Sequence, residues 1–362
     1  MRFPGFEGEW ESCELGEIAE FSKGAGISKD QRSSDGNPCI LYGELYTTYL
    51  TEIIDEVVSK TNLDPTGLVR SKANDIIIPA SGETAIDIST ARCVLQNDVL
   101  LGGDLNIIRL FNQDGRFFSY QLNGIRKKDI ARIAHGVSIV HLHGNALSHI
   151  TVNYPSRSEQ EKISSLLSLI DQRIAIQNKV IERYESLIKA LCHNLIISSK
   201  GKVCHIGDIL KIGSGKDYKH LNAGSVPVFG TGGYMLSVSD WLYEGESVCI
   251  GRKGTINNPF YVEGKFWTVD TLFYTYDFEG VLPKYCYYLF QTIDWLQYNE
   301  ASGVPSLSKS TIERIRISIP SIDEQAKAVQ VLDRVEMAIT CWRELLNHYE
   351  SIKQYLLSQL FI

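Results

Sequence analysis

The feature that most constrains this chain is a long internal repeat. Residues 155–197 match residues 320–362 without a gap when the sequence is shifted by 165 positions. Thirteen positions are identical in the two copies, including the Pro-Ser start and the pairs Glu159-Gln160 and Glu324-Gln325. A repeat of this kind indicates a duplicated structural unit, so the fold must place both copies in similar surroundings.

Each copy is predicted to form one long helix. A serine at the start can cap it, and a glutamate three residues later can reach back to the N–H of that serine, as Ser156 with Glu159 and Ser321 with Glu324. Apolar residues then recur in steps of four and three, which is typical of a coiled coil. The seam residues are Ile163, Leu167, Ile170, Ile174, Ile181, Tyr184 and Leu191 in the first copy, and Leu332, Val335, Ile339, Trp342, Leu346, Tyr349 and Leu356 in the second. Gln177 and Lys353 interrupt the seams, so we expect them to be weak points.

The composition is that of an ordinary globular protein with room for two or three domains. The chain has 362 residues, of which 44% are hydrophobic and 22% are charged. Because no stretch is apolar enough to span a membrane and the first residues lack a signal core, we expect a cytoplasmic protein. Eight cysteines without a Cys-x-x-Cys pair are expected to be reduced and mostly buried. The net charge of −7 neither supports nor excludes nucleic acid, since a local basic face can still bind phosphate.

The remaining sequence forms two similar segments, each in front of one copy of the repeat. We predict a first domain at 1–155, a long helix at 156–199, a second domain at 200–320 and a second long helix at 321–362. The apolar runs 76–78 and 248–250 are predicted to be equivalent buried strands. They lead into Ala80-Ser81-Gly82 and Arg252-Lys253-Gly254, respectively.

This order of segments predicts an α+β fold with two similar globular domains. The most economical packing joins them by two long antiparallel helices that form a coiled coil, a pseudo-two-fold dumbbell with one domain at each end. Such a chain would hold two binding domains a fixed distance apart.

Several fragments resemble catalytic motifs but lack the context that those motifs require. Asn257-Asn258-Pro259-Phe260 resembles the Asn-Pro-Pro-Phe signature of adenine methyltransferases without its first proline, and no Gly-rich cofactor loop precedes it. Gly213-Ser214-Gly215-Lys216 lacks the earlier glycine and the following Ser or Thr of a phosphate loop. His135, His141, His143 and His149 have no carboxylate or cysteine at metal-site spacing, so loop or surface histidines are expected. We therefore predict no catalytic residue, metal site or cofactor in this chain.

Both domains offer loop residues that suit contact with DNA. Arg, Lys and Asn side chains can reach base edges, while Lys, Ser and backbone N–H groups hold phosphates. The strongest candidates, Arg252, Lys253 and Thr255, follow a predicted buried strand. The full set is Lys23, Tyr42, Tyr46, Ser81, Thr84, Lys216, Lys219, Tyr234, Arg252, Lys253, Thr255, Asn257, Asn258 and Lys309. Arg92 belongs to a wider group of basic and polar residues that the first domain offers.

Two domains that are each followed by Pro-x-x-x-Glu-Gln and a heptad helix resemble the specificity subunit of type I restriction-modification systems. The opening Arg2-Phe3-Pro4-Gly5-Phe6-Glu7-Gly8-Glu9-Trp10 is also similar to the start of many such subunits. The resemblance implies two target recognition domains that each read one half of a split, asymmetric double-stranded DNA sequence, with helix length setting the gap. It also implies docking of two modification subunits and of restriction subunits, which would carry S-adenosylmethionine, ATP and magnesium.

Two other functions stay open at the level of sequence. A self-contained adenine DNA methyltransferase would require a functional segment at 257–260. A two-headed scaffold that does not bind DNA would fit the acidic charge. If the chain is a specificity subunit, partner contacts are expected on the outer faces of the helices, at Arg173, Lys179, Arg183, Arg334 and Arg343.

Overall fold

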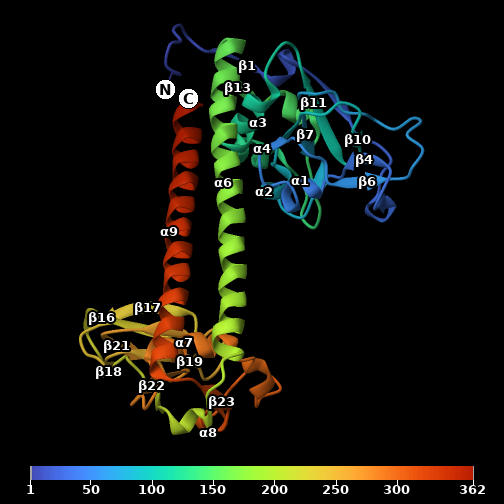
Figure 1. The fold of residues 1–362 in the computed structure, drawn as a ribbon. Coiled ribbons are helices and arrows are strands. Elements are labelled where there is room, and N and C mark those ends of the chain that lie inside the picture. Colours follow the sequence, from blue (N-terminus) through green and yellow to red (C-terminus); the bar gives the residue numbers. More distant parts are fainter. Residues whose placement is uncertain (1, 362) are drawn as a thin grey trace. The chain divides into compact units, whose positions relative to one another are not determined.

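The computed structural model describes residues 2–361, and it confirms that the chain is α+β (Figure 1). The chain divides into two compact units. Unit 1 comprises Met1–Asn178 and Leu345–Ile362, and unit 2 comprises Lys179–Glu344. Each unit therefore contains one globular domain and parts of both long helices. Ile362, the predicted end of the second helix, lies outside the described residues, as does Met1.

Two β-sheets form the framework of unit 1. The larger sheet contains, in spatial order, β2 (Ala19–Lys23), β11 (Leu105–Leu110), β7 (Asp75–Pro79), β9 (Arg92–Val94) and β5 (Ile53–Ile54). The second sheet contains β10 (Leu100–Leu101), β4 (Asn37–Ile40), β6 (Ser59–Thr61) and β3 (Arg32–Ser33). Two short pairs are β1 (Glu11–Glu14) with β13 (Thr151–Tyr154), and β8 (Ser81–Gly82) with β12 (Val140–His141). The β-branched run of β7 is buried on both faces, as predicted for 76–78.

Unit 2 is built on the same plan. Its first sheet contains β15 (Lys211–Ser214), β22 (Leu272–Tyr276), β19 (Ser247–Gly251) and β20 (Phe260–Val262). The second contains β17 (Gly233–Val238), β16 (Ala223–Gly230), β21 (Lys265–Thr268) and β18 (Tyr243–Glu244). A short pair joins β14 (Lys202–His205) to β23 (Arg316–Ile319). The buried strand predicted at 248–250 is β19.

Two helices are much longer than the others. They are α6 (Arg157–Cys192), continued by a π-helical turn at His193–Ile197, and α9 (Ile322–Leu360). With 36 and 39 residues, they measure roughly 54 and 58 Å at 1.5 Å per residue. The shorter helices are α1 (Glu44–Thr47), α2 (Ala85–Ile88), α3 (Gly115–Asn123), α4 (Lys127–Ile133) and α5 (Gly144–Ser148) in unit 1, and α7 (Pro283–Thr292) and α8 (Lys309–Glu313) in unit 2.

The duplication extends through the backbone of both domains. Hydrogen bonds of 2.7–3.0 Å recur at matching positions of the two units. Named with the N–H donor first, the matching pairs are Leu15–Ile150 and Ile206–Ile315, Gly24–Leu105 and Gly215–Leu272, Ala80–Asp104 and Arg252–Thr271, and Leu142–Ala80 and Leu307–Arg252. The two domains therefore share one framework, although few of their side chains are the same.

A buried glutamine at the same position of each repeat copy ties the long helix to its domain. Gln160 accepts the N–H of Asp114 over 3.0 Å and donates to the carbonyl of Pro155 over 2.8 Å. Gln325 likewise accepts the N–H of Leu282 and donates to the carbonyl of Pro320, both over 2.9 Å. Asp114 and Leu282 directly precede α3 and α7. Each glutamine thus joins the start of a domain helix to the start of a long helix.

The helix cap predicted for the first copy is wrong. Glu159 is fully buried, accepts the N–H of Phe3 over 3.1 Å and lies 2.9 Å from the guanidinium of Arg2. In the second copy the predicted contact is confirmed, because Glu324 accepts the N–H of Ser321 over 3.0 Å. The difference arises because residues 2–3 supply Glu159 with a charged partner, and charge-assisted hydrogen bonds are the stronger ones.

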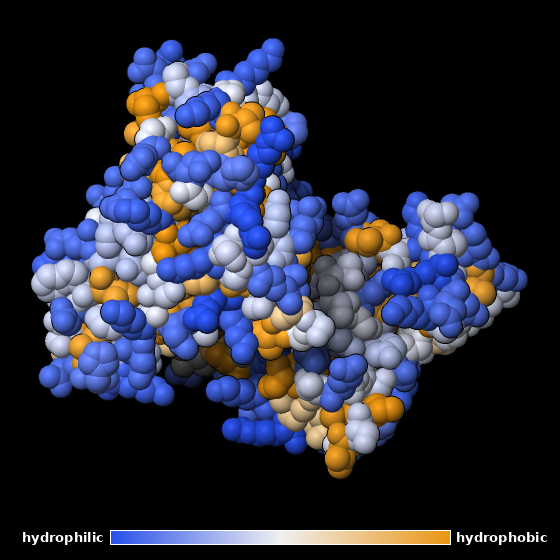
Figure 2. All heavy atoms as spheres, turned by 90° about the horizontal axis from the view of Figure 1, so that it is seen from below, coloured by the Kyte–Doolittle hydropathy of each residue, from blue (hydrophilic) through white to orange (hydrophobic). Residues whose placement is uncertain are grey.

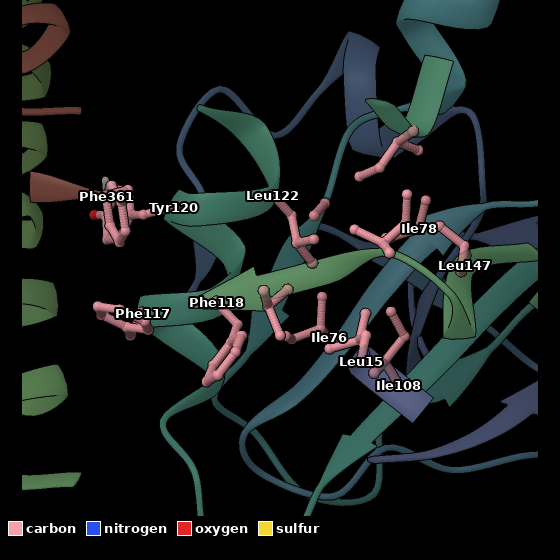
Figure 3. Close-up of a cluster of buried hydrophobic side chains, with 14 of the residues drawn as sticks. Leu15, Ile76, Ile78, Ile108, Phe117, Phe118, Tyr120, Leu122, Leu147 and Phe361 are labelled. Carbon is pink, nitrogen blue, oxygen red and sulfur yellow. The ribbon is translucent and has the colours of Figure 1, made fainter. Parts of the chain in front are cut away.

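The core of unit 1 is completed by side chains from both long helices. Ile163 and Leu167 come from the start of α6, while Leu357 and Leu360 come from the end of α9. Phe361 follows α9 and packs on Phe117, with the ring centroids 5.0 Å apart (Figure 3). The C-terminal residues are therefore part of the first domain's core, although that domain occupies the N-terminal part of the sequence.

Unit 2 uses the same repeat positions, contributed by the opposite copies. Its core includes Ala328 and Leu332 from the start of α9, with Cys192 and Ile196 from the end of the first repeat copy. Each of these residues is 165 positions from a core residue of unit 1: the pairs are Ile163 with Ala328, Leu167 with Leu332, Cys192 with Leu357, and Ile196 with Phe361. Each core therefore combines the start of one repeat copy with the end of the other.

Lys353 is not the weak point that its place in an apolar seam predicted. Its ammonium group lies 2.7 Å from the carboxylates of both Asp171 and Glu52. The hydroxyl of Tyr120 also donates to Asp171 over 2.6 Å. Burial lowers the pKa of Lys353, but the two carboxylates outweigh that effect and leave the pKa raised, so the side chain stays charged. Gln177, the other interruption, is buried as well.

Replacing Gln160 by alanine should destabilise unit 1. The change leaves the N–H of Asp114 and the carbonyl of Pro155 without their partner, so the free energy of unfolding in urea should fall by about 2–4 kcal/mol. Gln330→Ala, at an exposed position of α9, is the control and should change it by less than about 0.5 kcal/mol. Equal effects of the two substitutions would contradict the role of Gln160.

Replacing Lys353 by methionine should cost about 3–5 kcal/mol of stability, because Asp171 and Glu52 would be left buried without their cation. Arg343→Met is the matched control, since Arg343 forms an exposed ion pair of 2.6 Å with Glu185 in unit 2 and its loss should cost at most about 1 kcal/mol. Adding Glu52→Gln and Asp171→Asn to the Lys353 variant should recover much of the loss in thermal melting. Failure to recover would show that the charges are not the cause.

Candidate nucleic-acid interface

Unit 2 contains a hollow of about 720 Å³ that gathers three of the predicted DNA-binding cations. Arg252, Lys253 and Lys309 line it, together with Ser214, Ser308 and Phe273. These residues come from the ends of β15 and β19, from β22, and from the segment that leads into α8. The structure therefore brings together residues that the sequence separates by nearly a hundred positions.

The backbone fixes the position of the Arg252-Lys253 loop. The N–H of Arg252 donates to Thr271 O over 2.8 Å, and its carbonyl accepts the N–H of Leu307 over 2.9 Å. Lys253 forms a β-bridge with Ser306. At Gly251, a β-carbon would lie 2.0 Å from the carbonyl oxygen of Thr255, so only glycine allows this close turn. The loop is thus held on both sides before any ligand binds.

The guanidinium group of Arg252 is oriented but remains exposed. Its Nη1 donates to the carbonyl of Asp270 over 3.3 Å, and its carbon lies 5.9 Å from the ring centroid of Phe273. An arginine fork has five N–H donors, so this anchoring leaves others for a ligand. A planar fork held in this way suits bidentate recognition of guanine or phosphate.

One carboxylate, that of Glu300, also lines the hollow. Glu300 accepts hydrogen bonds from the hydroxyls of Thr311 and Ser308, the latter over 2.7 Å, and these bonds lower its pKa. It therefore stays ionised and offsets part of the charge of the three cations. The remaining excess of positive charge favours an anionic ligand.

The other candidates in unit 2 do not line this hollow. Lys216 and Lys219 are exposed after β15, and the hydroxyl of Tyr234 is hydrogen-bonded to Ser237 over 3.1 Å. Thr255, Asn257 and Asn258 are exposed between β19 and β20. Ser214 and Phe273, which do line the hollow, were missed, because nothing in the sequence shows that β15 and β22 end beside Arg252.

In unit 1, four candidates lie near α1 and β8. A β-carbon at Gly82 would lie 3.6 Å from the Tyr46 hydroxyl. The pKa of Tyr46 is raised by burial first, then by Tyr42 and by the carboxylates of Asp87 and Glu83. Thr84 caps α2 by accepting the N–H of Asp87 over 3.1 Å.

Two unit 1 residues are less accessible than the sequence suggested. Ser81 is buried, with 8% of its surface exposed. Arg92 is also buried and donates to the carbonyls of Leu45 and Tyr49 over 3.0 and 2.8 Å, so its role is structural. Both lie in strands that face the core. Lys23 is exposed at the end of β2.

The fragments that resemble catalytic motifs occupy ordinary structural positions. Residues 257–259 are the connection into β20, which begins at Phe260. Gly213 and Ser214 belong to β15, which runs into a loop and not into the helix that a phosphate loop requires. Within residues 2–361, no three His, Cys, Asp or Glu side chains are grouped so that they could hold a metal ion. All eight thiols are free, and five are buried.

The surface is mixed in character. On the face that Figure 2 shows, hydrophobic side chains lie in small groups among hydrophilic ones. None of the helices in the described part of the chain is both long enough and apolar enough to cross a membrane.

Comparison with known proteins identifies relatives whose sequences match only part of this chain. The EcoprrI specificity subunit of a type I restriction enzyme from Escherichia coli is 23% identical over 148 residues, which cover 38% of this chain and 36% of that protein. A putative type I specificity subunit of Haemophilus influenzae is 24% identical over 115 residues, covering 31% of this chain and 30% of that protein. The matched regions thus span about a third of these relatives.

Solved structures show a similar fold over nearly the whole chain. The S subunit of a type I restriction-modification system from M. genitalium superimposes with a TM-score of 0.73 and 18% identity, covering 100% of this chain and 99% of that one. A chain from a structure concerned with assembly and conformational transition of the type I system gives a TM-score of 0.57 at 12% identity, covering 98% and 97%.

The sequence model of one family matches most of the chain in two segments, residues 7–186 and 199–348. These two segments correspond to the two domains whose hydrogen-bond framework is repeated, each with the greater part of its long helix. The family is described as the type I restriction modification DNA specificity domain. The chain belongs to this family of type I restriction-modification specificity subunits.

Proposed function

We propose that this chain is a non-catalytic specificity subunit whose two units each read one half of a bipartite, asymmetric DNA target. The observation that carries the proposal is one hydrogen-bond framework that presents different side chains in the two units. Arg252 and Lys253 stand where unit 1 has Ala80 and Ser81. Equivalent frameworks with different loop residues suit the reading of two different base sequences.

The hollow of unit 2 supplies a surface for one half-site. Arg252 has the geometry to read a guanine edge in the major groove, and Lys253 and Lys309 can hold neighbouring phosphates. Since the whole chain carries a net charge of −7, we infer that partner subunits contribute part of the phosphate contacts.

The long helices act in this proposal as an antiparallel coiled-coil spacer between two domains in a pseudo-two-fold arrangement. Each core combines the start of one repeat copy with the end of the other, which supports an antiparallel pairing. All fourteen predicted seam residues are buried or half-buried, which is consistent with a seam between the helices. Helix length would then set the number of unread base pairs.

Partner subunits would carry the chemistry. By family resemblance, two modification subunits and the restriction subunits dock on this chain and bring S-adenosylmethionine, ATP and magnesium. The outer helix residues Arg173, Lys179, Arg183, Arg334 and Arg343 are exposed and could take part in docking, although Arg343 also pairs with Glu185. A cytoplasmic location remains part of the prediction.

Inserting one heptad into both helices tests the spacer. Insertions after Asn178 and after Glu344 leave the residues of each unit intact. Seven residues add roughly 10.5 Å of helix, so the gap between the half-sites should lengthen by about three base pairs. Sequencing of methylated sites in cells that contain the modification partner would measure the gap.

The matched control is a heptad in α6 alone. It shifts one helix against the other and should abolish methylation, whereas the double insertion should keep both half-sites. An unchanged gap in the double insertion would exclude the spacer role.

Replacing Arg252 and Lys253 by alanine should weaken DNA binding by the complex with its modification partner. Losing one base contact costs about 1–3 kcal/mol and should relax the half-site read by unit 2 alone. Losing the phosphate contact should also make the plot of log binding constant against log salt concentration less steep, by about one unit of slope. Arg316→Ala, at an exposed position of β23, is the control. Equal loss of both half-sites would show that the pair serves folding or general phosphate contact.

A further inference from the structure

Three exposed histidines lie on one segment of unit 1 whose role the sequence did not reveal. His135, His141 and His143 are all exposed. His135 and His141 exchange backbone hydrogen bonds of 3.0 and 2.7 Å, and the rings of His135 and His143 lie 5.7 Å apart. We call residues 135–143 the histidine hairpin. It is anchored to the domain because β12 pairs with β8 and the N–H of Leu142 donates to Ala80 O.

The histidine hairpin is the structural counterpart of one wall of the hollow in unit 2. His135 N donates to His141 O over 3.0 Å, just as Glu300 N donates to Ser306 O over 3.0 Å. Ser81 pairs with His141, as Lys253 pairs with Ser306. The matching positions are therefore His135 with Glu300, His141 with Ser306, and His143 with Ser308. All three counterparts line the hollow.

Another wall of the hollow has its counterpart at Lys23. Gly24 N donates to Leu105 O as Gly215 N donates to Leu272 O, which places Lys23 at the position of Ser214. Lys23 is paired with Asn106 across β2 and β11, and the Asn106 amide donates to the carbonyl of Leu142 over 2.9 Å. A continuous chain of contacts thus connects Lys23 to the histidine hairpin.

The two surfaces distribute their donors differently. The three cations of the hollow correspond to Ala80, Ser81 and Gly144 in unit 1, none of which carries a charge. In their place unit 1 presents one lysine and three imidazoles. A neutral imidazole has one N–H donor and one acceptor nitrogen, so it can hydrogen-bond to base edges as well as to phosphate. Such a surface can contact DNA without a strongly basic composition.

We propose that the histidine hairpin and Lys23 form the DNA-contacting surface of unit 1, with the imidazoles reading bases of the first half-site. This inference rests on the proposed function, because it transfers the role of the hollow in unit 2 to the matching surface in unit 1. It identifies a recognition surface on a domain whose residues 1–155 carry 14 basic and 20 acidic side chains.

The test uses the full chain in complex with its modification partner and duplexes that carry the mapped target. In one variant His135 and His143 are replaced by glutamine, and in a second His141 is replaced by glutamine. His149→Gln is the matched control, because His149 is an exposed histidine of the same unit that is bound instead to Glu14 over 2.8 Å. Fluorescence anisotropy measures affinity for the target and for duplexes altered in one half-site, and thermal melting checks folding.

The double variant should bind the target about tenfold more weakly or worse and should lose discrimination only at the half-site that the Arg252 and Lys253 variant leaves intact. Binding and discrimination equal to those of the His149 control would overturn the inference, and so would equal loss at both half-sites. If the Arg252 and Lys253 variant also bound every duplex like the unaltered chain, the proposed function would fail as well. If that variant lost its own half-site while the histidine variants lost nothing, only this inference would fail.

Discussion

Apolar packing of the repeat termini into the two cores is the constraint on which the rest of the structure depends. Each core takes the start of one repeat copy and the end of the other, so neither domain is complete with the helix that directly follows it. Leu357, Leu360 and Phe361 thus bury their side chains in a domain formed more than two hundred residues earlier. Fully burying such a side chain is worth about 1.5–3 kcal/mol, which makes the C-terminal residues a large part of the stability of unit 1.

Buried polar contacts at the junctions then fix how each helix leaves its domain. Gln160 and Gln325 bind the N–H of the residue that precedes a domain helix and a proline carbonyl, and they do so in the same way in both units. Lys353 supplies a cation to Asp171 in unit 1, where the matching residue of the first copy is Ile188. In unit 2 the carboxylate that matches Asp171 is Glu336, which pairs instead with Lys284 over 3.1 Å. The shared contacts preserve the framework, while the loops are free to differ.

Sequence reasoning succeeded where the signal was periodic or repeated, and failed where it depended on partners distant in the chain. The long helices, the buried strands β7 and β19 and the α+β class followed from hydrophobic patterning. The partners of Glu159 and Lys353 lie 156 and 301 residues away, so local rules misjudged both. At the site, Arg252 and Lys253 were identified, but Ser214, Phe273 and the histidine hairpin became meaningful only once the strands placed them.

The central claim is that two related domains on one chain read two different half-sites across a fixed gap. The most direct measurement is the mapping of methylated adenines in DNA from cells that express this chain with its modification partner. The account predicts a single asymmetric sequence in two parts, separated by a constant number of unspecified base pairs. A contiguous motif, a variable gap, or methylation independent of this chain would contradict it.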